Sequence, residues 1–187
     1  MADLLRIAAL LKAATDAATK RLQDGGSRAA WEREMHAALT RGHTAAWIAG
    51  TAERLGIKPD SPLISERRLS KAERAEIKAL VEKQLGYLSG FVKDMDGLSN
   101  AQIVARAGLY AGAARGSYYG ARWGDWDIPP ELMPGAQKCV GNCRCKISIA
   151  DNGDGTGILT REMGGAEHHC SECPPLVGDH PVRRKAA

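Results

Sequence analysis

The chain has 187 residues, with 26 Lys and Arg against 22 Asp and Glu, so its formal net charge is only +4. That surplus is too small for a dedicated duplex-DNA binder, which needs many cations to neutralise phosphates. Hydrophobic residues make up 44% of the chain, but 30 residues are alanine and aromatics reach only 5%. Small apolar side chains suit closely packed helices, whereas β-sandwich strands favour branched and aromatic residues.

Two kinds of targeting segment are not expected. No stretch approaches the roughly 18 apolar residues of a membrane-spanning helix. The first 20 residues carry Asp3, Arg6 and Lys12 among their apolar positions, which argues against a secretory signal. We therefore expect a soluble, helix-rich, non-secreted protein with no membrane partner.

Apolar spacing predicts two helices at the start of the chain. Residues 4–22 repeat apolar side chains at helical intervals, and Gly25 with Gly26 ends the run. Ser27 is a typical N-cap for a second helix, which closes before Gly56. The two histidines of this helix, His36 and His43, are interpreted as ordinary surface residues.

Two capping boxes predict the next helices. Ser70 with Glu73 starts a helix over residues 70–96, and Ser99 with Gln102 starts a fourth that continues to about Arg122. The fourth is rich in Ala and Gly, which favours close approach of a neighbouring helix. These helices form a predicted helical domain, residues 1–122.

The composition changes at Trp123. Residues 123–137 contain three prolines and no periodicity, which predicts an extended linker. Alternating apolar residues then predict strands at 146–150 and 158–162, joined by an Asn- and Gly-rich turn. Residues 174–187 are predicted to form a loose basic tail. The predicted fold is mainly α, a helical domain followed by a small zinc-stabilised β-hairpin module over residues 138–187.

The cysteines carry the strongest site signal. All five lie in the last 50 residues, an arrangement that favours a shared ligand. Zinc takes four thiolate or imidazole ligands, usually from two close pairs, and a full set makes the site structural rather than catalytic. The candidate ligands are four of these five cysteines, with His168 or His169 as substitutes: Cys139, Cys143, Cys145, Cys170 and Cys173. Local disulfides and free thiols are the alternatives.

Other chemistry is weaker in this sequence. The turn at residues 151–155 resembles a calcium loop but lacks the Glu that such a loop needs, and a hairpin turn explains it. Asp179-His180-Pro181 after a Cys-x-x-Cys pair resembles metal-dependent HNH nucleases, but too few residues follow it. No phosphate loop, nucleophile elbow or His-Glu-x-x-His motif is present. We therefore expect no enzymatic activity and no small-molecule substrate.

A second candidate site lies near the end of the fourth predicted helix. No acidic residue occurs between Asp96 and Asp125. Within that window, four residues share one helical face and are of types enriched at protein interfaces: Arg115, Tyr118, Tyr119 and Arg122. This face is a candidate for partner binding. The alternative is that the tyrosines pack against the hairpin while the arginines are solvated.

The order of these features resembles a known family. A helical region containing QLGYLSGFVKDMDGLSNAQIVARAGLYAGAARGSYY precedes a proline-containing linker and then Asn142-Cys143-Arg144-Cys145. This order is similar to bacteriophage minor head proteins, the head-morphogenesis proteins related to the F protein of phage Mu. Their hallmark is His-x-Asn-Cys-Arg-Cys, and Val140 stands here in place of the His. The chain thus resembles a divergent branch in which Cys139, Cys170 and Cys173 complete a metal site.

The resemblance implies a structural role without catalysis. It implies a location in the virion head, and in the host cytoplasm during assembly, with a function in head assembly or DNA delivery. The implied partners are the portal or major capsid protein, with packaged DNA as a further contact. The alternative is a zinc-ribbon module that binds nucleic acid through Arg144, Lys146, Arg161 and the basic residues 183–185. Against that alternative, residues 138–187 hold seven basic and six acidic residues.

Overall fold

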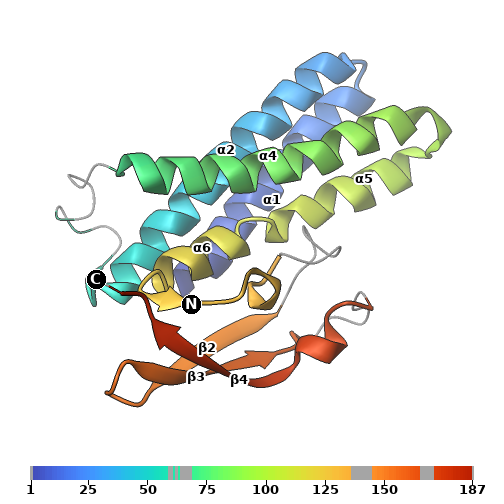
Figure 1. Cartoon of the computed structure of the whole chain (residues 1–187). Helices are drawn as coiled ribbons and strands as arrows, with labels where there is room; N and C mark the ends of the chain where they lie inside the picture. Colours follow the sequence, from blue (N-terminus) through green and yellow to red (C-terminus); the bar gives the residue numbers. More distant parts are fainter. Residues whose placement is uncertain are drawn as a thin grey trace.

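The computed structural model describes residues 2–58, 61, 63, 69–135, 145–164 and 171–186. A layer of helices lies over a small antiparallel sheet (Figure 1). In the described residues, no helix is long and apolar enough to cross a membrane.

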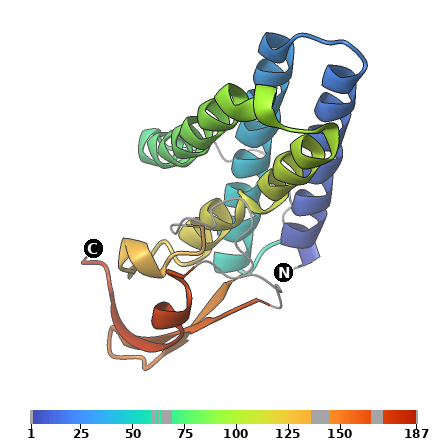
Figure 2. The same cartoon turned by 90° about the vertical axis from the view of Figure 1, so that its right-hand side faces the viewer.

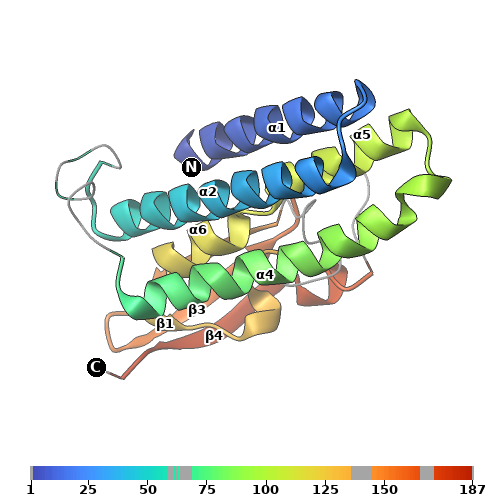
Figure 3. The same ribbon diagram turned by 90° about the horizontal axis from the view of Figure 1, so that it is seen from above.

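The long helices are α1 (Ala2–Gln23), α2 (Arg28–Arg54) and α4 (Lys71–Asp94). Seen from above, they lie side by side across the sheet (Figure 3). The Ser27 hydroxyl accepts a hydrogen bond from the amide of Ala30 and caps α2. Ser70 and Glu73 form the expected capping box of α4, and a short 3₁₀ turn, η1 (Met95–Gly97), follows that helix. The two predicted caps are thus confirmed.

The fourth predicted helix is interrupted. Its capping box, Ser99 with Gln102, is confirmed, but the segment divides into α5 (Asn100–Gly108), the 3₁₀ turn η2 (Leu109–Gly112) and α6 (Arg115–Arg122). Gly108 and Gly112 end two of these pieces, and glycine lowers the helix propensity at both points. The prediction of one continuous helix was therefore wrong. Figure 2 shows α5 and α6 as separate segments beside the long helices.

Helix α6 packs closely along α2, and the glycine that permits it belongs to α2 rather than to the predicted fourth helix. At Gly50 a Cβ atom would lie 2.1 Å from the carbonyl oxygen of Tyr118. Next to that contact, the Glu53 carboxylate accepts a hydrogen bond from the Tyr118 hydroxyl and pairs with Arg122 at 2.9 Å. The missing side chain at Gly50 thus lets the two backbones meet.

The sheet contains β1 (Trp126–Asp127), β2 (Lys146–Asp151), β3 (Thr156–Glu162) and β4 (Gly178–Arg184), in the order β1-β4-β3-β2. Short 3₁₀ turns, η3 (Pro130–Leu132) and η5 (Pro174–Leu176), precede β2 and β4. The predicted hairpin is β2–β3, with Ile149 opposite Leu159. In its turn, Asp151 and Asp154 accept backbone hydrogen bonds from Gly153 and Thr156, so the turn interpretation holds.

The predicted loose tail is instead an inner strand. Residues 178–184 form β4, which pairs with β3 on one side and with β1 on the other. β1 itself belongs to the segment expected to be an extended linker. Both differences have one cause, because these two short segments stabilise each other only once they meet in the sheet.

One hydrophobic cluster spans the helices and the sheet. Leu11 and Trp31 from the helices share it with Ile147, Leu159 and Val182 from the strands. Trp31 also contacts Phe91 edge-to-face, with ring centroids 5.6 Å apart. The sheet therefore rests on the helical layer through a shared core.

Candidate functional site

Two of the predicted metal ligands are buried at one end of the sheet. Cys145 directly precedes β2, Cys173 directly precedes η5, and each is 1% exposed. Ile147 pairs with Arg161, which in turn pairs with Gly178, so β2 and β4 both begin where β3 ends. The fold thus brings two cysteines that are distant in sequence to the same end of the sheet.

Arg161 is a buried charged residue at this end of the sheet. Its side chain is fully buried, and its Nη1 donates to the carbonyl oxygens of Glu131 at 3.1 Å and Leu132 at 2.6 Å. Its Nη2 lies 3.9 Å from the sulfur of Cys173. A buried guanidinium is costly without compensation, and a nearby cation favours the thiolate form of a cysteine. The arrangement can therefore hold negative charge on sulfur.

Sequence reasoning assigned Arg161 only to a surface that binds nucleic acid. That assignment does not fit a side chain that is 0% exposed. A signal was present in the strand itself, where Gly157, Leu159 and Arg161 alternate inward and all three are buried. A charged residue in the inward register of a strand indicates a buried partner.

The other predicted metal ligands lie outside the described residues: Cys139, Cys143, Cys170, His168 and His169. Within the described ranges, no group of three or more Cys, His, Asp or Glu is arranged to hold a metal ion. Those ranges contain only two of the five cysteines. Zinc binding therefore stays a prediction.

The predicted partner face is less exposed than expected. Tyr118 and Tyr119 are each 1% exposed and contact each other edge-to-face, 5.1 Å apart. Arg122 pairs with Glu53 and lies 4.8 Å from the ring of Trp123. Arg115 is half-buried. Both tyrosines are therefore packed, as the alternative interpretation expected, and α6 turns this face toward α2 and the core.

The electrostatics of that face follow from its burial. Burial raises the pKa of the Tyr118 hydroxyl, and its hydrogen bond to Glu53 raises it further. Burial opposes ionisation of Glu53, but the hydrogen bond from Tyr118 and the charge of Arg122 outweigh it and lower the pKa of the carboxyl. Glu53 is therefore charged at neutral pH and anchors α6 to α2.

His43 was missed as an interior residue. It is 1% exposed, and its Nδ1 lies 2.7 Å from the Oγ of Ser117. Burial lowers the pKa of His43 to about 4, so the ring is neutral at pH 7. Sequence reasoning placed His43 on the surface, because only the α2–α6 contact reveals which face of α2 is covered. His36, by contrast, is exposed as expected.

The structure offers two chemical settings. The end of the sheet combines two buried cysteine thiols with the buried guanidinium of Arg161, which suits a closed metal or thiolate site. The His43–Ser117 pair resembles part of a nucleophilic dyad, but Ser117 is 0% exposed, so its hydroxyl is not accessible to a substrate. Comparison with known proteins adds no relative, since no protein-family model, curated protein or solved structure matches this chain.

Proposed function

We propose that this protein is a structural, non-catalytic component of a bacteriophage head that meets the portal or major capsid protein. Its C-terminal sheet would be fixed by one structural zinc ion. The proposal begins with the Asn142-Cys143-Arg144-Cys145 element after a helical region, which resembles the minor head proteins. The observation that carries it is the burial of Cys145 and Cys173 at one end of the sheet, where Arg161 lies 3.9 Å from the sulfur of Cys173.

Burial of both thiols supports a structural metal. A catalytic zinc keeps one position open to water or substrate, whereas a structural zinc has four protein ligands and no open position. Four thiolates around Zn²⁺ carry a net charge of −2, and hydrogen bonds from charged donors stabilise such sulfur. Arg161 supplies a donor of this kind, 3.9 Å from the sulfur of Cys173.

Metal analysis tests the zinc site. The full chain, purified under reducing conditions without chelator, is expected to contain about one zinc ion per molecule. Cys145→Ser and Cys173→Ser should each lower that content, whereas Thr160→Ser, a similarly small change on the same sheet, should not. Wild-type protein without metal would contradict the site. Because a cysteine variant could fail to fold, cobalt substitution of the wild type provides a second measurement, through the absorption bands of thiolate-bound Co²⁺.

Virion composition tests the head assignment. Mass spectrometry of purified particles and proheads is expected to detect the protein together with the portal protein. Its absence from both, combined with tight and salt-sensitive DNA binding by the isolated protein, would favour the zinc-ribbon alternative. Two arginines that this alternative would use have other partners, because Arg161 is buried and Arg184 pairs with Asp151 at 2.5 Å.

A further inference from the structure

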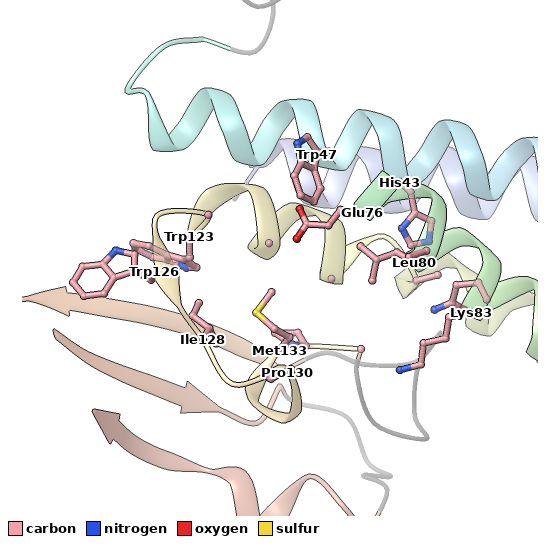
Figure 4. Close-up of a pocket in the computed structure, with 18 of the residues that line it drawn as sticks. His43, Trp47, Glu76, Leu80, Lys83, Trp123, Trp126, Ile128, Pro130 and Met133 are labelled. Atoms are coloured by element: carbon pink, nitrogen blue, oxygen red, sulfur yellow. The ribbon is translucent and has the colours of Figure 1, made fainter. Parts of the chain in front are cut away.

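A cavity of about 430 Å³ lies between helices α2, α4 and α6 and the segment 126–135 (Figure 4). Its size falls in the range of small-molecule pockets, about 300–1,000 Å³. The cavity is separate from the end of the sheet that holds Cys145 and Cys173, because neither cysteine lines the cavity. None of the sequence signals pointed to it.

The long axis of the cavity follows helices α2 and α4. His43 contacts Ser117 at one end, and one turn further along α2 the ring of Trp47 lies 3.5 Å from where a Cβ of Gly120 would be. Trp47 also donates a hydrogen bond to Glu73 near the start of α4. Since α4 lines the cavity from Glu76 to Gln84, at 1.5 Å per residue, the cavity is about 12 Å long.

Three buried polar atoms, each on a residue that lines this cavity, have no hydrogen-bond partner within the described residues. They are His43 Nε2, Gln84 Oε1 and Trp123 Nε1. The side chains of His43 and Gln84 are 1% and 4% exposed. Buried polar atoms in native proteins are nearly always hydrogen-bonded, so exceptions that share one cavity indicate a ligand or water. Trp123 lies near one end of the cavity and His43 near the other (Figure 4).

We propose that this cavity binds a neutral, elongated and mostly apolar small molecule with a hydroxyl or amide at one end. The walls are mostly apolar, with Trp47, Leu80 and Met133 facing the space (Figure 4). The polar end of the ligand meets His43 and Gln84, the two most buried of these three lining residues. This inference needs neither zinc nor a phage particle.

The end of the cavity at His43 and Gln84 disfavours a charged ligand group. Burial lowers the pKa of His43 to about 4, so its ring presents a neutral donor or acceptor at pH 7. Which of these Nε2 offers depends on the proton shared between Nδ1 and Ser117, and a hydroxyl can satisfy either case. Charged side chains such as Glu76 and Lys83 are exposed, so they stand where the cavity meets solvent. A charged ligand end placed at His43 would lose its hydration, and the neutral ring offers it no countercharge.

Binding of 4-butylphenol to the full-length protein tests the proposal. The measurement is the shift of the indole ¹⁵N–H signals, with Trp31 as internal control because its N–H is bonded to Thr19 away from the cavity. Saturable shifts are expected at Trp47 and Trp123. Butylbenzene, which lacks the hydroxyl, should bind about threefold to tenfold more weakly. The anion 4-butylbenzoate should bind more weakly still.

Variants assign the shifts to this cavity. Ala79 is exposed at the rim, so Ala79→Trp should block entry without disturbing the core. The matched control is Lys78→Trp, a neighbouring exposed residue that does not line the cavity. Gln84→Leu should remove most of the preference for the phenol over butylbenzene. The proposal is overturned by no saturable shift, by tighter binding of the benzoate, or by equal binding to both tryptophan variants.

Discussion

Gly50→Ala should be the most informative single change in the helical layer. A Cβ at this position would lie 2.1 Å from the carbonyl oxygen of Tyr118 and 3.0 Å from the amide nitrogen of Arg122. Both atoms belong to the backbone of α6, so no side-chain rotation relieves the clash. Ordinary contact begins at 3.4 Å, and α6 must therefore move by more than about 1 Å.

The expected cost follows from two opposing effects. Alanine in place of glycine within a helix gains about 1 kcal/mol. Overpacking costs about 1–3 kcal/mol, and the upper value applies here because the contact is with backbone. The net loss is about 2 kcal/mol, which lowers Tm by about 4–8 °C in a chain of this size.

Gly86→Ala is the matched control. Gly86 is exposed on α4, and a Cβ there meets nothing within 4 Å. Its helix propensity gain should raise Tm by about 2–4 °C. Thermal unfolding followed by circular dichroism measures both variants. If Gly50→Ala melts at or above the wild type, the close approach of α2 and α6 is wrong.

Three further changes test the interior. The pKa of His43 is about 4 in the folded protein and 6.5 in the unfolded chain. The contribution of the neutral ring to folding stability is therefore complete above pH 6.5 and decreases as the pH falls toward 4. Between pH 7 and 4, the free energy of unfolding measured in urea should therefore fall by about 3 kcal/mol more for the wild type than for His43→Gln. Equal decreases would contradict a buried neutral ring. Arg161→Met should cost about 3 kcal/mol in the same assay, because it removes the donor to two buried carbonyls, and an unchanged urea midpoint would exclude that role. Ser70→Ala should lower stability by about 1 kcal/mol through loss of the α4 cap, while Ser89→Ala on the exposed part of α4 should have little effect; similar losses would contradict the cap.

Local signals predicted much of this fold. The caps at Ser27, Ser70 and Ser99 depend on hydrogen bonds between residues three apart, so the sequence alone contains both partners. The β2–β3 hairpin is equally local, since alternation and a turn determine its register. These parts needed no knowledge of distant contacts.

The remaining features depend on residues far apart in the chain. β4 contains a proline and two arginines and lacks apolar alternation, so only its pairing with β1 and β3 makes it a strand. The sequence left open whether Tyr118 is exposed or packed, because the face of α2 that covers it cannot be identified from α6 alone. The cavity arises from several elements at once, and no single segment indicates it.

The order of the strands also suggests how the sheet assembles. The β2–β3 hairpin closes a short loop and can form quickly, whereas β4 must bridge β3 and the distant β1, where Trp126 pairs with Arg184. Non-local pairing carries a larger loop-closure cost and is slow. Until residues 178–184 arrive, the edge of β3 and the backbone of β1 are open to pairing with other chains. Aggregation during refolding should therefore be most sensitive to changes in β4, a strand that contributes only Val182 to the core.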